Sequence, residues 1–244
     1  HDLAKKYNFK IIEDASHAIG ARYKAEPVGN CRYSDITIFS FHPVKIITTG
    51  EGGMALTNAP QLAKKMKLLH SHGITSDAKE MHPKPAEEIW NYQQIDLGFN
   101  YRMTDIQAAL GLQQMKRLDE FVSKRQSIAK RYDELLSNEL LVKPWQHEDS
   151  YSSYHLYVIR VKPGKTNKTH RQIYEALRVL NILVNLHYIP VYRQPYYEQM
   201  GFKAGYCPQA EQYYSEALSI PMYSRLTSQQ QVSVMVALRK AIQA

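Results

Sequence analysis

The sequence predicts an α/β protein in which a mainly parallel sheet is followed by a smaller α+β domain. In the first sixty residues, short apolar or β-branched runs at 9–14, 35–39 and 54–57 alternate with turns, as in a sheet covered on both faces. From about residue 131 the pattern changes to helices mixed with strands, and 244 residues suffice for one large domain or two small ones. We therefore expect one domain over residues 1–130 and a second over residues 131–244.

The elements of the first domain follow from local signals. Residues 1–7 have the pattern of a helix end that leads into the first strand, and Pro60 suits the first turn of a helix over 61–72. Residues 76–88, with two prolines at 83 and 85, predict a loop. Thr104 and Gln107 form a capping-box pattern that opens a further helix, with helical spacing continuing to residue 117.

The second domain is expected to follow a helix over residues 121–136 that links the two parts. An apolar run at 154–161 predicts a strand, and Thr169 with Gln172 predicts a capped helix. The apolar run at 182–186 predicts another strand, and residues 209–218 and 228–241 predict two final helices. This order is typical of an α+β fold.

Composition narrows the functional classes. No apolar run approaches the ~20 residues that a membrane-spanning helix needs, and the start of the chain has no signal-peptide pattern. Cys31 and Cys207 are too few and too far apart to indicate a disulfide scaffold or a metal site, so a reducing cytoplasm is the expected compartment. The net charge of +8 comes from scattered pairs of basic residues, which argues against nucleic acid and is compatible with a nucleotide-diphosphate substrate.

The turn after the run at 35–39 contains the most informative residue, Lys45. Hydroxyl residues and glycines surround it in the segment 40–53. A lysine amine can condense with an aldehyde to form a Schiff base, and small residues let a bulky cofactor approach the backbone. The alternative interpretation is a solvated surface lysine.

A carboxylate at the end of the preceding apolar run strengthens the first interpretation. Asp14 ends the run at 9–14, so both Asp14 and the Lys45 turn are expected at the carboxyl ends of strands, where α/β sheets bind ligands. Pyridoxal phosphate needs both groups: an amine for its aldehyde, and a carboxylate that keeps its ring nitrogen protonated. Taken alone, a helix N-cap is the commoner use of such an aspartate.

Three longer motifs resemble those of a known family. Residues 13–18 (EDASHA), 40–53 (SFHPVKIITTGEGG) and 97–105 (LGFNYRMTD) are similar to the DegT/DnrJ/EryC1/StrS sugar-nucleotide aminotransferases, over nearly the whole chain. The similarity is closest to the aminotransferases of the pseudaminic-acid pathway, which share an HYIPV segment like that at 187–191. The resemblance implies fold type I, pyridoxal phosphate as cofactor and transamination.

The resemblance also implies roles for individual residues. Lys45 would be the catalytic lysine, and the cofactor-binding residues would be Asp14, His17, Ser40, Asn100 and Arg102, with no metal. In the family, the asparagine matching Asn100 reaches the phosphate in the neighbouring subunit, so a homodimer with a shared site is expected. From the residues alone, His17 could be a structural histidine, Ser40 a strand-terminating serine and Arg102 a surface group.

By resemblance, the aromatic-rich segment 186–197 would face the substrate. Its polar-tipped rings suit a sugar, and His187, Tyr192 and Gln194 are the predicted substrate-binding residues. A small hydrophobic core with wet edges is the alternative. By resemblance, the substrates would be L-glutamate and a UDP-linked 4-keto-6-deoxy-N-acetylhexosamine, aminated at C4 on the pseudaminic-acid route. A perosamine or bacillosamine precursor is the alternative sugar.

One departure from the family concerns length. Family members are longer at the N-terminal side, so residues 1–130 would be the C-terminal part of the large cofactor-binding domain, and residues 131–244 the small domain. A sheet without its first strands exposes an edge and apolar surface, which should promote association. An inactive remnant that serves only for dimerisation or binding is therefore a further alternative.

Overall fold

The computed structural model describes residues 1–83, 88–136, 140–162 and 164–243. The chain divides into two compact units, His1–Leu118 and Asp119–Ala244, called unit 1 and unit 2 below. The predicted boundary after residue 130 falls inside helix α4 (Leu118–Leu135). Part of the predicted loop at 76–88, residues 84–87 with Pro85, lies outside the described residues.

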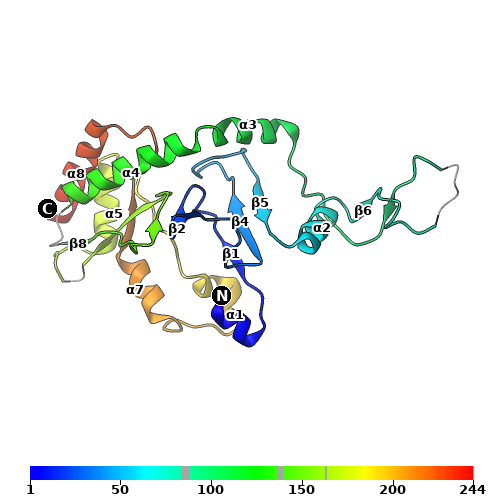
Figure 1. The fold of residues 1–244 in the computed structure, drawn as a ribbon. Coiled ribbons are helices and arrows are strands. Elements are labelled where there is room, and N and C mark those ends of the chain that lie inside the picture. Colours follow the sequence, from blue (N-terminus) through cyan, green and yellow to red (C-terminus); the bar gives the residue numbers. More distant parts are fainter. Residues whose placement is uncertain (84–87, 137–139, 163, 244) are drawn as a thin grey trace. The chain divides into compact units, whose positions relative to one another are not determined.

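The sheet of unit 1 positions the site. It has the order β1-β4-β5, formed by Ile12–Asp14, Ile36–Ser40 and Gly53–Leu56 (Figure 1). β1 runs parallel to β4, with Asp14 opposite Ile38, and β5 is antiparallel to β4. The predicted strands are confirmed, and the sheet is mixed. Because β1 and β4 are parallel, Asp14 and Ser40 lie at the same end of the sheet, where the carboxyl ends of the two strands meet.

The faces of this sheet are only partly covered. Ile12 on β1 is 63% exposed and Met54 on β5 is 49% exposed, whereas Phe39 on β4 is buried. The expectation of a sheet covered on both faces is therefore not met by the described residues. The expected exposure of apolar surface is present at these strands.

The helices of unit 1 begin where their caps predict. α2 (Pro60–Leu69) has its proline in the first turn, and α3 (Asp105–Met115) opens with a complete capping box between Thr104 and Gln107. Both helices end two or three residues earlier than their apolar spacing predicts. The remaining elements of unit 1 are α1 (Asp2–Tyr7), β2 (Arg22–Tyr23), β3 (Glu26–Pro27), β6 (Ile74–Thr75) and β7 (Gln93–Gln94).

Unit 2 is an α+β unit, as predicted. Its central strand β10 (Tyr157–Val161) lies between β11 (Ala217–Ile220) and β8 (Leu141–Val142), antiparallel to both. The inward face of β10 is buried, and the centroid of the Tyr157 ring lies 5.0 Å from that of the Tyr132 ring on α4. Its other elements are β9 (Ser150–Tyr151), α5 (His170–Val179), a 3₁₀ turn (Val191–Arg193), α6 (Pro195–Glu198), α7 (Pro208–Glu216) and α8 (Ser228–Gln243).

Two predictions in unit 2 are wrong. Residues 182–186 form no strand, and only Asn185 makes an isolated bridge, to Ser219. The helix predicted over 209–218 ends at Glu216, and the next four residues are strand β11. All four are buried and pair with or adjoin β10, so the sheet rather than local propensity determines their conformation.

No helix in the described ranges combines the length and apolar character required to cross a bilayer.

Candidate active site

Asp14 is fixed at the end of β1 by the residues that follow it. Its Oδ1 accepts hydrogen bonds from the Ser16 hydroxyl at 2.5 Å and from the Ser16 backbone N–H at 3.0 Å. These bonds hold the pKa of Asp14 below its usual value, and the nearby charges of His17 and Lys45 act in the same direction. Asp14 is therefore an ionised carboxylate close to both residues. Ser16 was not among the predicted residues, although Asp-x-Ser is a recognisable turn pattern.

Lys45 lies in the turn between β4 and β5. The backbone N–H of Lys45 donates to the His42 carbonyl at 2.9 Å, and the next two residues, Ile46 and Ile47, are buried and anchor the turn. The Lys45 side chain is half-buried. Burial lowers the pKa of its amine, and the Asp14 carboxylate opposes that shift.

The charged groups of Asp14 and Lys45, the two central predicted residues, lie close enough to interact, because each changes the pKa of the other. One group is an ionised carboxylate and the other an amine whose proton is easier to remove than that of a solvated lysine. This is the pair of groups that an aldehyde cofactor with a basic ring nitrogen requires.

Helix α3 supports the Lys45 turn. The Thr48 N–H donates to Gln114 Oε1 at 3.0 Å, and Gln107 Nε2 donates to the Glu51 carbonyl at 3.2 Å. Gly111 faces the turn so closely that a Cβ there would lie 2.7 Å from Thr49 Cγ2. Gly50 has a φ of 83°, a conformation that favours glycine. Contacts with α3 therefore stabilise the turn, and the sequence of the turn alone does not predict them.

The residues predicted to bind the cofactor phosphate lie in two places within unit 1. Ser40 ends β4, and its hydroxyl oxygen accepts the His42 N–H at 3.4 Å. Asn100 bridges to Ser71, and its Oδ1 accepts from Arg102 Nε at 3.4 Å. Arg102 is exposed, and its Nη2 is 3.5 Å from Nε2 of His72, a residue that the sequence did not single out.

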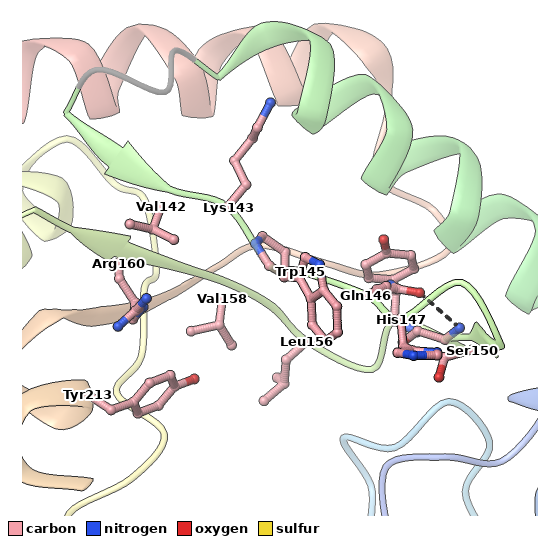
Figure 2. Close-up of a pocket in the computed structure, with 13 residues that line it drawn as sticks. Val142, Lys143, Trp145, Gln146, His147, Ser150, Leu156, Val158, Arg160 and Tyr213 are labelled. Atoms are coloured by element: carbon pink, nitrogen blue, oxygen red, sulfur yellow. Dashed lines mark hydrogen bonds between the residues drawn. The ribbon is translucent and has the colours of Figure 1, made fainter. Parts of the chain in front are cut away.

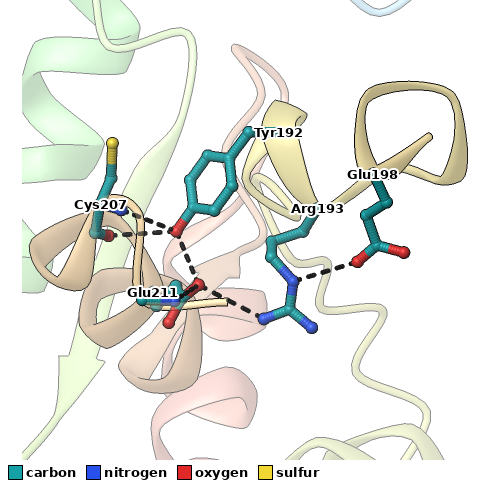
Figure 3. Close-up of polar contacts among 6 residues, drawn as sticks. Tyr192, Arg193, Glu198, Cys207 and Glu211 are labelled. Carbon is teal, nitrogen blue, oxygen red and sulfur yellow. Dashed lines mark hydrogen bonds and ion pairs between the residues drawn. The ribbon is translucent and has the colours of Figure 1, made fainter. Parts of the chain in front are cut away.

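The predicted substrate-binding residues all belong to unit 2. His187 Nδ1 lies 2.6 Å from the Ser219 hydroxyl, and the exposed Gln194 is the N-cap of α6. The Tyr192 hydroxyl donates to Glu211 Oε1 at 2.7 Å (Figure 3). Glu211 was not predicted, since nothing in the sequence links positions so far apart.

A separate cavity of about 580 Å³ lies on the outer face of β10 (Figure 2). Apolar and aromatic side chains form most of it, and a guanidinium lies at one end, paired with Glu216. The main lining residues are Val142, Trp145, Leu156, Val158, Arg160 and Tyr213. None of the predicted site residues is among the described residues that line it.

A family model matches residues 1–239, and its description is the DegT/DnrJ/EryC1/StrS aminotransferase family. The chain belongs to this family. The resemblance predicted from the motifs is thereby confirmed. The chain spans about three fifths of the length of the curated relatives that it matches.

Individual relatives agree with this assignment. The chain is 38% identical, over 92% of its length and 56% of the relative, to a UDP-4-amino-4,6-dideoxy-N-acetyl-beta-L-altrosamine transaminase of Campylobacter jejuni. Among solved structures, Helicobacter pylori PseC, an aminotransferase involved in pseudoaminic acid biosynthesis, matches with a TM-score of 0.87 and 31% identity, covering 99% of this chain and 62% of PseC.

A second solved structure is a putative sugar aminotransferase, Spr1654 of Streptococcus pneumoniae, in its PMP form. It matches with a TM-score of 0.86 and 30% identity, covering 98% of this chain and 60% of Spr1654. The predicted aminotransferase fold is confirmed by these two structures.

Proposed function

We propose that the protein is a pyridoxal-phosphate-dependent sugar aminotransferase. The observation that carries this proposal is that Asp14 ends β1, that Lys45 lies in the turn that follows the parallel strand β4, and that the charge of each shifts the pKa of the other, so the two groups lie near each other. Spr1654 is known in PLP and PMP forms, which supports the same cofactor here. When bound, the cofactor supplies an electron sink that stabilises negative charge next to the transferred amine.

The residues of unit 1 have distinct proposed roles. Lys45 would hold the cofactor through its amine and, once released as a free base, would move the proton at the substrate carbon. Its lowered pKa suits both tasks because each requires the unprotonated amine. Asp14 is ionised and hence able to keep a proton on the ring nitrogen.

The remaining predicted contacts complete the proposed cofactor site. His17 would lie beside the ring, and the Ser40 hydroxyl would bind the phosphate. Asn100 and Arg102, joined by their own hydrogen bond, would bind the phosphate of a partner subunit in a homodimer. This arrangement makes the active site a property of the dimer.

We propose that the amino acceptor is a UDP-linked 4-keto-6-deoxy-N-acetylhexosamine on the pseudaminic-acid route, and that L-glutamate is the donor. The names of the Campylobacter jejuni and Helicobacter pylori relatives support this sugar. His187, Tyr192 and Gln194 would contact it. The two cysteines, Cys31 and Cys207, are free, as expected for a cytoplasmic enzyme.

The decisive experiment is to add pyridoxal phosphate to the whole protein and record its visible absorption. A band that is present in the wild type, absent in Lys45→Ala and retained in Lys10→Ala, an exposed lysine, is the expected result. A wild-type protein without any band would contradict the proposal and favour the inactive remnant. Amination of a panel of UDP- and dTDP-linked ketosugars would then identify the acceptor and exclude or establish the perosamine and bacillosamine types.

A further inference from the structure

The segment that precedes α7, residues 187–206, has little regular structure of its own. It contains only the short 3₁₀ turn and the four-residue helix α6, and most of its side chains are exposed. A segment of this kind has few buried contacts that could define its conformation. The Tyr206 ring packs against those of Tyr192 and Phe202, with ring centroids 5.6 and 5.0 Å apart. Beyond these ring contacts, the conformation of the segment depends on specific polar contacts.

One carboxylate on α7 makes those contacts. Glu211 Oε1 accepts hydrogen bonds from the Tyr192 hydroxyl at 2.7 Å and from the Gly205 N–H at 2.9 Å, and it lies 3.3 Å from Arg193 Nη1 (Figure 3). Tyr192 and Arg193 lie near the start of the segment, and Gly205 lies at its end. A single oxygen thus closes the segment into a loop.

Tyr192 and Arg193 make further polar contacts, and the pKa shifts of Glu211 and Tyr192 show which of the two donates the proton of their shared hydrogen bond. The Cys207 N–H donates to the Tyr192 hydroxyl oxygen at 3.2 Å, while Arg193 Nε donates to Glu198 at 3.4 Å. The bond from Tyr192 holds the pKa of Glu211 below its usual value, and partial burial together with Glu211 raises the pKa of Tyr192. Near neutral pH Glu211 is therefore an ionised acceptor and Tyr192 a protonated donor.

We propose that Glu211 is a positioning residue for the amino-acceptor sugar. Since the Tyr192 hydroxyl is bonded to Glu211 and to the Cys207 N–H, Tyr192 offers its ring face, rather than a hydrogen-bonding hydroxyl, to a sugar. Glu211 holds that ring and the Arg193 guanidinium in place without contacting the substrate. This inference rests on the proposed function, in which the segment faces the sugar.

The test is steady-state kinetics of the whole protein with the keto sugar, for wild type and Glu211→Ala. We expect the KM for the sugar to rise about tenfold or more while kcat changes by less than about twofold, because ground-state binding is lost and the chemistry is not. The visible cofactor band and the reaction with L-glutamate should stay unchanged. Glu211→Gln keeps an acceptor oxygen but no charge, so its KM should lie between the two.

Control measurements distinguish a failure of the proposed role of Glu211 from a failure of the proposed function. Glu175→Ala removes an exposed glutamate that pairs with Arg171 on α5, and it should leave every parameter unchanged. An unchanged KM in Glu211→Ala, or equal loss of the sugar and glutamate reactions, would overturn the role of Glu211. A wild-type protein without the cofactor band would instead overturn the proposed function, and the positioning role with it.

Discussion

Burial and charge act in opposite directions at Lys45. Burial lowers the pKa of its amine, and the Asp14 carboxylate raises it again. Asp14→Asn removes only the second effect, so the pKa of Lys45 should fall further. Because acylating reagents react with the unprotonated amine, the pH midpoint of Lys45 labelling, followed by peptide mass spectrometry without cofactor, should shift to lower pH in this variant.

The matched control for this shift is Asp35→Asn, which removes an acid paired with Lys10 instead. Its Lys45 midpoint should equal that of the wild type. If Asp14→Asn also left the midpoint unchanged, the two groups would not share a site, and the observation that supports the proposed function would be lost.

Arg125 is a buried cation that is bonded to carbonyl oxygens. It is 6% exposed, and its Nη1 donates to the carbonyls of Tyr154, His155 and Met222 at 2.9 to 3.2 Å. Burial lowers its pKa to about 10. Arg125→Ala would leave three carbonyls without this donor, at a cost of about 3 kcal/mol in unfolding free energy.

Urea unfolding measures this cost. Arg171→Ala removes an exposed arginine whose ion pair with Glu175 is solvated, and it should change the unfolding free energy by less than about 1 kcal/mol. Equal unfolding midpoints for the two variants would show that the carbonyl contacts of Arg125 contribute nothing to stability.

At the scale of elements, local signals predicted what depends on local chemistry. The capping boxes at Thr104 and Thr169 and the first-turn Pro60 all mark helix starts correctly, because a cap satisfies backbone groups within one turn. The strand predicted over 182–186 is wrong, and residues 217 and 218, the start of the apolar run 217–220, were wrongly included in the helix predicted over 209–218. Short apolar runs fit a helix or a strand equally well, and pairing with β10 selects strand for only the second.

The same distinction applies to the site. Lys45 and Asp14 could be singled out from the sequence because Asp14 ends a strand and Lys45 lies in the turn after the next strand, each within a recognisable motif. Glu211 and His72 could not, because their partners are Tyr192 and Arg102, which only the fold brings near. Contacts between distant positions leave no pattern in a single sequence.

The contact of α3 with the Lys45 turn gives a prediction about element packing. In Gly111→Ala the new Cβ would lie 2.7 Å from Thr49 Cγ2, and Thr49 is buried and β-branched. Overpacking of this kind costs about 1 to 3 kcal/mol, against a gain of about 1 kcal/mol in helix propensity. The melting temperature should therefore fall.

Relief of the contact is the control. Thr49→Ser removes the methyl group and keeps the hydroxyl that donates to the Glu51 carbonyl at 2.7 Å. The melting temperature of the double variant, Gly111→Ala with Thr49→Ser, should be higher than that of Gly111→Ala alone. Equal melting temperatures for the single and double variants would mean that the contact with Cγ2 is not the source of the loss.

At the scale of the whole molecule, unit 1 carries apolar side chains that its own fold leaves in solvent. Ile106 on α3 is 85% exposed, Leu97 is 81% exposed and Trp90 is 74% exposed. Leu97 and Ile106 lie close in sequence to Asn100 and Arg102, which are proposed to reach the partner subunit, so we expect them at the dimer interface. We expect Ile106→Asp to reduce the mass measured by light scattering. Val179→Asp, at a comparably exposed position on α5, should leave the mass unchanged.

The proposed dimer also predicts how two inactive variants combine. If each active site takes Lys45 from one subunit and Arg102 from the other, a heterodimer of Lys45→Ala and Arg102→Ala contains one intact site. Random exchange makes half of the dimers mixed, so about a quarter of wild-type activity should return. If every site were built within one subunit, no mixture would contain an intact site. Activity of the mixture near zero would therefore place Arg102 outside the partner's site, even if the protein is a dimer.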